Sequence, residues 1–465
     1  MLTKFITSLA VFSVILISGC ADSQFSATHP TQGSPTENPA AGPASKPSEP
    51  PEIASQTATE PRGQITLREA VAYALVNSPQ LRAFSWDIHT AEANQMQAAL
   101  LPNPELEVAV EEFGGTGERR AFNSSESTIQ IGQFIELAQK RSKRIHLASL
   151  EKQLAQWDYY AKRLDVMNQV AAAFVDVLAA QERLTLSKEL LRLAEQTHAA
   201  VAQRVSGGKD SPLEETKAKV ALSTMQIQSQ AAAQALKSAR TRLAAAWGAP
   251  AAEFHSAVGQ FYQVSPVPDL NDLEARTSQN PDIARWTVEE QKYRAALNLE
   301  KAKATSDPTI RGGLKQLNEG DDTAFIIGLS IPIPMFDRNQ AGISRATYAI
   351  EKAAEQRRAV EVNIQTALAQ AAQNLATAFT EATVLANDVV PGAQSAFDAA
   401  TQGYQAGKFD YLDVLDAQRT LFEAKGQYVS SLAGYHKVRA DVERLIGRDL
   451  DSLKNLPETK VNESK

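Results

Sequence analysis

The sequence has one cysteine, few aromatic residues and no excess of positive charge. Aromatic residues make up only 6% of the chain, which, together with abundant alanine, favours long, closely packed helices over a bulky globular core. The six histidines lie far apart and form no cluster with metal-ligand spacing, so we predict no metal site. A net charge of -7 lacks the basic footprint of a nucleic-acid-binding protein.

Motifs that carry catalysis are also missing from the sequence. It has no nucleophile-plus-base pattern and no glycine loop of the kind that holds phosphates. We therefore predict that the protein is not an enzyme and needs no cofactor.

Residues 1–19 have the pattern of a signal peptide that precedes a cysteine. A basic start is followed by an apolar run over residues 9–17 and by small residues before Cys20. This pattern resembles a bacterial lipobox, in which Cys20 becomes the lipid-bearing N-terminus; the alternative is an ordinary signal peptide that contains a cysteine. Ala21 stands where an aspartate would resemble an inner-membrane retention signal, so we expect delivery to the outer membrane.

Residues 20–62 are rich in proline, serine, threonine and alanine and have no apolar periodicity, which predicts a lipidated tether. Residues 451–465 form a polar C-terminal tail. No later run is long and apolar enough for a transmembrane helix. If the chain crosses a membrane, we expect it to do so with strands.

The chain between these ends repeats itself with a period near 200 residues. We predict a first repeat over residues 63–265 and a second over 266–450, each with the order helix, strand, loop, strand, long helix, turn, long helix. Chance similarity of alanine-rich helices could mimic part of this match but not the strand pairs in register. The matching positions are Asn77-Ser78-Pro79 with Gln279-Asn280-Pro281, Asn103-Pro104 with Asp307-Pro308, Ile131-Gly132 with Ile327-Gly328, and Gly208 with Gly407.

Four segments alternate apolar and polar residues with the period of two that is typical of strands. Each is about ten residues long, which suits a tilted membrane-crossing strand, although a half-buried soluble sheet would show the same alternation. Four strands cannot close a pore-sized barrel, and an open sheet edge cannot survive in lipid. We therefore predict a homotrimer with twelve strands, whose outer loops are residues 112–126 and 317–323. The apolar row contains Leu106, Val108, Val110, Ile129, Ile131, Ile310, Leu314, Phe325, Ile327, Leu329 and Ile331.

Two long helical stretches are predicted over residues 140–206 and 339–402, where only Pro391 interrupts a helix-favouring sequence. Each is about 65 residues, or roughly 100 Å at 1.5 Å per residue. Shorter return helices are expected over residues 212–247 and 411–446. A solid soluble coiled coil is one interpretation; a hollow helical tube is favoured because the same chain carries the strands.

Over residues 64–450 the sequence resembles the TolC family of outer-membrane efflux ducts. "LPNPELEVAVEEFGG" and "IGQFIELAQKRSKRI" are similar to its CzcC-type heavy-metal branch, and "IPIPMFDRNQAGI" to its strand-to-helix junction. The most specific match is "YQAGKFDYLDVLDAQRTLFEAKGQY" over residues 404–428. The resemblance implies a mainly α fold with a small transmembrane β part: a trimeric twelve-strand barrel continuous with a twelve-helix periplasmic barrel.

The resemblance also implies partners and a cargo. A periplasmic adaptor and a proton-driven inner-membrane pump of the RND class would complete a tripartite system, in which this chain is a passive conduit. Heavy-metal cations follow from the branch, while a multidrug or type I secretion duct of the same fold is the alternative. A periplasmic coiled-coil adaptor without a pore is a further hypothesis.

In the resembled family, aspartates of the "DVLDA" stretch line a constriction at the periplasmic end, and they correspond here to Asp413 and Asp416. A ring of such carboxylates would attract cations. Asp413 also has a structural interpretation, because it stands three residues after Asp410 as in a capping box. By the repeat offset Glu214 is the counterpart of Asp413, and it has the same two interpretations: a residue of the periplasmic constriction, or, as we favour, the residue that closes a similar box on Ser211, with Pro212 at the first helical position.

Family latching contacts at these tips include a tyrosine that corresponds to Tyr404 and an arginine whose place is taken by Phe409. The resemblance also makes the tips docking points for the adaptor. Four glycines flank the two turns, and we expect left-handed turn geometry for them: Gly207, Gly208, Gly403 and Gly407.

Overall fold

A computed structural model of the chain describes residues 60–209, 211–278, 280–448 and 450. These residues belong to one compact unit, Glu49–Lys465. The predicted signal peptide, Cys20, nearly all of the tether and the C-terminal tail lie outside the described residues.

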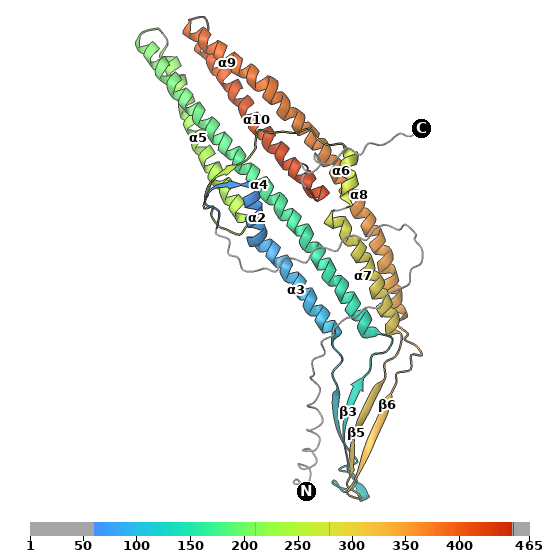
Figure 1. Cartoon of the computed structure of the whole chain (residues 1–465). Helices are drawn as coiled ribbons and strands as arrows, with labels where there is room; N and C mark the ends of the chain where they lie inside the picture. Colours follow the sequence, from blue (N-terminus) through green and yellow to red (C-terminus); the bar gives the residue numbers. More distant parts are fainter. Residues whose placement is uncertain (1–59, 210, 279, 449, 451–465) are drawn as a thin grey trace, which may run out of the picture. The chain divides into compact units, whose positions relative to one another are not determined.

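The two halves of the chain contain similar elements in a similar order (Figure 1). The first half has β1 (Gly63–Thr66), α2 (Leu67–Asn77), α3 (Pro79–Ala99), β2 (Glu105–Glu111), the short η2 (Gly117–Arg119), β3 (Glu126–Phe134), α4 (Lys140–Ser206) and α5 (Pro212–Ala245). β4 (Phe254–Val258) follows at the end of the first predicted repeat, and the second half has α6 (Leu270–Thr277), α7 (Pro281–Lys303), β5 (Thr309–Leu317), β6 (Asp322–Ser330), α8 (Gln340–Val384), the π-helical turn η3 (Leu385–Val389), α9 (Val390–Gln405) and α10 (Tyr411–Ile446).

The prediction of one helix before each strand pair was wrong, because a proline divides it in both halves. Ser78 is the N-cap of α3 and Pro79 its first residue, while Asn280 and Pro281 have the same places in α7. The Asn280 side chain accepts a hydrogen bond of 2.7 Å from the backbone N–H of Asp282. Proline has no N–H to continue a preceding helix, but its fixed φ suits the start of a new one.

The predicted strands form one antiparallel sheet in the order β2-β3-β5-β6. Its register places Leu106, Ile131, Gly312 and Ile327 in one row across the four strands. The strands of the two halves therefore meet at the β3–β5 pair, and the predicted apolar residues share one face.

A second, two-stranded parallel sheet of β1 and β4 was not predicted. These strands have four and five residues, which is too short for their apolar alternation to stand out from the sequence. Ile65 of β1 and Phe254 of β4 are fully buried, so this sheet helps to form the core.

The long helices agree with their prediction in the first half and differ in the second. α4 runs without interruption for 67 residues. The second stretch is divided by η3 just before Pro391, since Pro391 cannot donate the α-helical hydrogen bond and a π turn accommodates the loss. Among the described helices, none combines the length and apolarity needed to span a bilayer.

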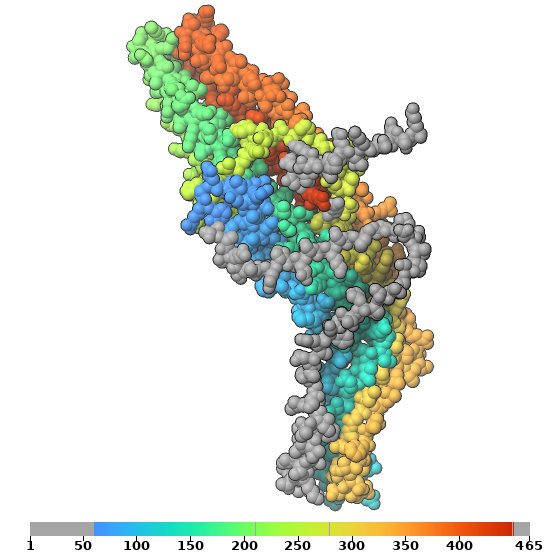
Figure 2. All heavy atoms as spheres, in the orientation of Figure 1, coloured from blue at the N-terminus to red at the C-terminus, as the bar shows by residue number. Residues whose placement is uncertain are grey.

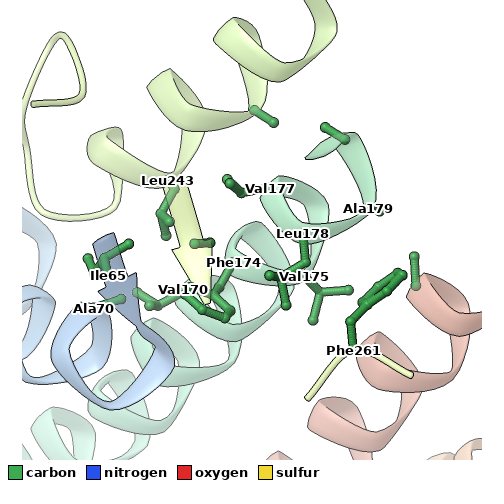
Figure 3. Close-up of a cluster of buried hydrophobic side chains, with 14 of the residues drawn as sticks. Ile65, Ala70, Val170, Phe174, Val175, Val177, Leu178, Ala179, Leu243 and Phe261 are labelled. Atoms are coloured by element: carbon green, nitrogen blue, oxygen red, sulfur yellow. The ribbon is translucent and has the colours of Figure 1, made fainter. Parts of the chain in front are cut away.

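The largest core cluster lies where α2, α4, α5 and the β1–β4 sheet meet (Figure 3). α4 contributes Val170, Phe174 and Val177, which pack near Leu243 of α5. Burying a side chain such as Leu243 contributes roughly 1.5–3 kcal/mol. This cluster fixes α4 against both its return helix and the N-terminal helices.

Candidate functional site

The four-stranded sheet has one charged face and one apolar face. On the charged face, Glu107 accepts a 2.8 Å hydrogen bond from Gln130 and lies 3.8 Å from the guanidinium of Arg311. Glu126 pairs with Lys315 on the same face. Polar side chains in rows of this kind are typical of a surface that faces water.

The opposite face is apolar and exposed to a degree that is uncommon in a soluble protein. Phe325 and Ile327 of β6 are 86% and 88% exposed, and Leu106 and Val108 of β2 are also exposed. An apolar surface of this size is typical of a contact with lipid or with another chain.

Two strands of this sheet, β2 and β6, each have a neighbour on one side only among the described residues. The helices pack side by side in two layers. Near the sheet the neighbours are α3, α4, α7 and α8 in that order, and farther from it they are α5, α4, α10 and α9. The outermost helices carry exposed large side chains: Trp86 on α3, Tyr348 on α8 and Ile227 on α5. Each layer of the molecule therefore has two edges that are open to further packing.

The junction between sheet and helices is held by the basic residues of the "KRSKR" stretch. Lys140 donates to Asp307 and to the Thr305 carbonyl, both at 2.5 Å. Arg141 and Arg144 donate to the Ala99 and Ala98 carbonyls, 2.6 and 2.9 Å away, at the C-terminus of α3. Cations there satisfy the last carbonyls of the helix.

The residues before α4 and α8, Gln139 and Asn339, both have a φ of 57°. They stand 200 positions apart, so the two repeats have the same uncommon left-handed backbone conformation at equivalent positions. Asn339 also binds α7, donating a 2.8 Å hydrogen bond to the Glu300 carbonyl. Asparagine tolerates the left-handed region, but this signal was missed at the sequence level.

At the other end, the α4–α5 and α9–α10 turns share one hydrogen-bond pattern. Lys209 N–H donates to the Arg204 carbonyl at 2.9 Å, and Lys408 N–H donates to the Gly403 carbonyl at 2.8 Å. Gly208 and Gly407 have φ values of 68° and 71°, as predicted. Each turn is a helix C-terminus closed around a left-handed glycine.

The prediction of left-handed geometry was wrong for Gly207 and Gly403. Gly207 has a φ of -80° at the C-cap of α4, and Gly403 is a residue within α9. A Cβ atom on Gly403 would lie 2.1 Å from Cδ2 of Phe409. Glycine is needed there because the Phe409 ring packs directly on the helix backbone.

Asp413 and Asp416 are both exposed near the start of α10 but differ in their bonding. Asp410 and Asp413 form the predicted capping box, in which the Asp410 N–H donates to Asp413 Oδ2 at 3.0 Å. Asp416 lies beyond the cap, one turn before Arg419. Arg419 is itself paired with Glu423 at 2.7 Å.

The box predicted for Glu214 is not found. Ser211 is the N-cap of α5 and Pro212 its first residue, as expected, but the Ser211 hydroxyl accepts from the N–H of Leu213 at 3.3 Å. The Glu214 N–H donates instead to the Ser211 carbonyl. The cap is therefore satisfied without the Glu214 carboxylate.

Tyr404 lies in a small cluster that connects the two helical hairpins at their tips. The guanidinium of Arg204 on α4 lies 4.8 Å from the centroid of the Tyr404 ring, a cation–π contact. The ring of Tyr411 is 6.0 Å away and almost fully buried, and this burial raises the pKa of Tyr411 to about 12. Sequence reasoning missed Arg204 and Tyr411, because neither spacing nor composition relates α4 to α10.

Next to this cluster the hairpins enclose a groove of 590 Å³ between α4, α5 and α10. Mainly apolar side chains line it, among them Leu190, Met225, Leu415 and Phe422, and Arg419 and Glu423 add one charge of each sign. Among the described residues, no group of three or more histidine, cysteine, aspartate or glutamate side chains is placed to hold a metal ion.

A comparison with known protein families identifies the family of the chain. The profile of a family described as "Outer membrane efflux protein" matches residues 70–249 and 274–448. The chain belongs to this family. Both matched segments contain a strand pair and a long helical hairpin, and each carries one of the two tips.

Relatives of this efflux protein include two metal-resistance proteins of Cupriavidus metallidurans. The cobalt-zinc-cadmium resistance protein CzcC is 35% identical over 84% of this chain and 91% of its own. The nickel and cobalt resistance protein CnrC is 24% identical over 70% and 77%. A solved structure of CusC, whose description refers to transmembrane channel formation, has the same fold, with a TM-score of 0.69, 17% identity and coverage of 82% and 92%.

Proposed function

We propose that the protein is the outer-membrane exit duct of a tripartite efflux system and that it conducts divalent heavy-metal cations as a homotrimer. A periplasmic adaptor would dock at the helix tips and an inner-membrane RND pump would supply the energy. The duct itself would perform no catalytic step and would need no cofactor beyond a lipid on Cys20.

The open edges of every layer are the observation that carries this proposal. One chain contributes four strands to the larger sheet, and the exposed apolar face of this sheet ends at β2 and β6, which pair on one side only among the described residues. Strand edges are not tolerated in lipid, so copies must join edge to edge until the sheet closes. Two copies would give eight strands, whose interior side chains fill; three give twelve and leave a lumen.

The polarity of the two sheet faces supports the same arrangement. In a closed barrel the apolar row with Phe325 and Ile327 would face lipid. The face with the Glu107–Arg311 and Glu126–Lys315 pairs would then line the lumen, where water solvates the charges.

The metal cargo rests on the relatives' names and on charge at the tips. Two relatives with substantial coverage are named for resistance to cobalt, zinc, cadmium or nickel. In a trimer, Asp416 would place a ring of carboxylates at the periplasmic entrance, while Asp413, Glu214 and Tyr404 would shape the helix tips around it. Such a ring favours cations over anions.

The proposal is tested by deleting the gene and complementing it. Growth is measured in cobalt, zinc, cadmium, nickel and a panel of hydrophobic drugs, and the mass of the purified protein is determined by native mass spectrometry. We expect sensitivity to at least one metal, complementation by the intact gene and a mass of three chains. Sensitivity to drugs alone would assign the protein to the multidrug ducts, and a monomer that conducts no ions would contradict the duct itself.

A further inference from the structure

Residues 331–336, Ile-Pro-Ile-Pro-Met-Phe, connect the end of β6 to the residues before α8; we call them the proline segment. The ladder ends at Ser330, yet the apolar alternation of β6 continues through Ile331, Ile333 and Met335. From Phe325 to Met335, every second side chain is at least 55% exposed. The segment from β6 to the start of α8, in light orange, lies on the visible face of the molecule in Figure 2.

The height of this row shows why the extension matters. Within the ladder the row contains only Phe325, Ile327 and Leu329, or about 13 Å of strand and about 10 Å of height at a tilt of ~40°. Extended to Met335 it covers about 33 Å of chain and about 25 Å of height. The apolar band of a membrane barrel is about 25 Å tall. The apolar row within the ladder is therefore too short for the hydrocarbon layer, and the row with the proline segment matches it.

Backbone chemistry makes the proline segment suited to lipid. Pro332 and Pro334 have no N–H, and the Met335 N–H donates to the Ile333 carbonyl at 2.9 Å. Three of the six residues therefore present no unpaired donor beyond the end of the ladder. Each unpaired N–H in hydrocarbon would cost several kcal/mol.

At the corresponding junction after β3, residues 135–139, the backbone N–H groups are satisfied in a different way. It lies beside β5 rather than at an edge, and the Ile135 N–H donates to the Pro308 carbonyl at 2.9 Å. The Leu137 N–H donates to Asp307 Oδ1 at 2.7 Å. The central junction thus has protein partners for its donors, whereas the edge junction replaces donors with proline.

The chain before β2, at the other edge of the sheet, also replaces backbone donors with proline. Before β2, Pro102 and Pro104 alternate with Leu101 and Asn103, and the Leu101 side chain is exposed. In a closed ring the edge before β2 would adjoin the edge after β6 of a neighbouring copy. Proline is common at strand edges, and here each outer junction has two prolines, which remove two N–H donors beyond the end of its strand.

Polar residues begin abruptly after Phe336. Asp337 accepts from the Asn339 N–H at 2.8 Å, and Arg338 Nε donates to the Pro334 carbonyl at 3.2 Å. Arg338 thus satisfies a backbone carbonyl of the proline segment, where a charged group marks the end of the apolar row.

We propose that acyl chains of the inner leaflet of the outer membrane cover the proline segment, so that the hydrocarbon boundary lies at Asp337 and not at the end of the β6 ladder. This inference rests on the proposed function, since it requires the sheet to be in the membrane. It extends the lipid-contacting surface of each chain by residues that belong to no strand.

Site-directed spin labels in proteoliposomes test the boundary. Cysteine is introduced singly as Ile333→Cys, Ile327→Cys and Glu351→Cys, the second within the ladder and the third on an exposed position of α8. Unsubstituted protein, whose single cysteine is Cys20, supplies the background. Each label is measured for collisions with oxygen, which enters lipid, and with a polar nickel chelate, which does not.

We expect the ratio of oxygen collisions to nickel-chelate collisions at position 333 to be close to that at 327 and several-fold higher than that at 351. A ratio at position 333 as low as that at 351 would mean that water reaches the proline segment. Low collision rates with both reagents would mean that a neighbouring copy covers it. Either result would overturn the inference. If position 327 itself reports water, the proposed membrane location of the sheet fails instead.

Discussion

At the residue scale, Asp413 and Asp416 are one turn apart yet have separate tasks. The Asp413 carboxylate accepts the N–H of Asp410 and completes the first turn of α10. Asp416 is exposed beyond the cap, and its neighbour Arg419 is paired with Glu423. The proposed attraction of cations at the tips therefore falls mainly on Asp416.

We predict that Asp416→Ala raises the conductance of the protein in planar bilayers and weakens block by divalent cations. Removing three carboxylates from one ring should raise the blocking concentration about ten-fold, which corresponds to about 1.4 kcal/mol. Single-channel recording in the presence of cobalt or zinc measures both effects. Unchanged conductance and block would remove Asp416 from the constriction.

Asp413→Ala is the matched control in the same helix. Loss of the box should cost about 0.5–2 kcal/mol of local stability and speed hydrogen exchange in the first turn of α10. Divalent block should stay close to that of the unsubstituted protein. A change in block as large as that of Asp416→Ala would show that the capping role does not describe Asp413 fully.

At the element scale, the two turns share one backbone design but differ in packing. Gly208 and Gly407 occupy the left-handed position in both turns. Only the α9–α10 turn brings a ring against the preceding helix, where Phe409 contacts Gly403. The α9–α10 tip is therefore stabilised by the packing of Phe409 on Gly403 as well as by the Arg204–Tyr404 contact.

Gly403→Ala should loosen the α9–α10 tip, because the added Cβ would lie 2.1 Å from the Phe409 ring. Displacing the ring should cost about 1–3 kcal/mol, measured as faster hydrogen exchange at the tip. Gly403→Ala combined with Phe409→Ala should recover most of this loss. Gly207→Ala is the control: its Cβ would find only ordinary contacts of 3.4 Å or more, so little change is expected.

Sequence periodicity predicted the elements whose signal is long, and it failed where the signal is short or comes from distant residues. The uninterrupted α4 and the alternating strands followed from period and length. The β1–β4 sheet was too short to detect, and Pro79 divides a stretch whose apolar pattern is continuous. Arg204 meets Tyr404 across 200 residues of sequence, a contact that no local pattern encodes.

At the scale of the whole molecule, open edges recur in every layer. β2 and β6 flank the sheet, while α3 with α8 and α5 with α9 flank the two helical layers. Because the free edges of the sheet and of both helical layers lie on the same two sides of the molecule, one rotation that closes the sheet into a barrel would also close the helical layers into a tube. A cyclic assembly satisfies this condition with a single type of interface.

This ring makes a prediction for disulfide cross-linking between copies. Val108→Cys on β2 is combined in turn with Phe325→Cys, Ile327→Cys or Leu329→Cys on β6. Neighbouring strands place facing Cβ atoms about 4.5–5.5 Å apart, close enough for one of the three pairs to form a disulfide. On a denaturing gel, oxidation should produce covalent dimers and trimers and nothing larger, because a ring of three has no remaining edge.

The matched control pairs Val108→Cys with Leu314→Cys, which lies on the same apolar face of the central strand β5. Strand β3 separates these positions within one chain, and β5 reaches no neighbouring copy in the proposed ring, so the control should stay monomeric on the gel. A ladder that continues beyond three chains would indicate an open polymer. A ladder that ends at two chains would indicate a closed eight-strand assembly, whose filled interior could not serve as the lumen of an efflux duct.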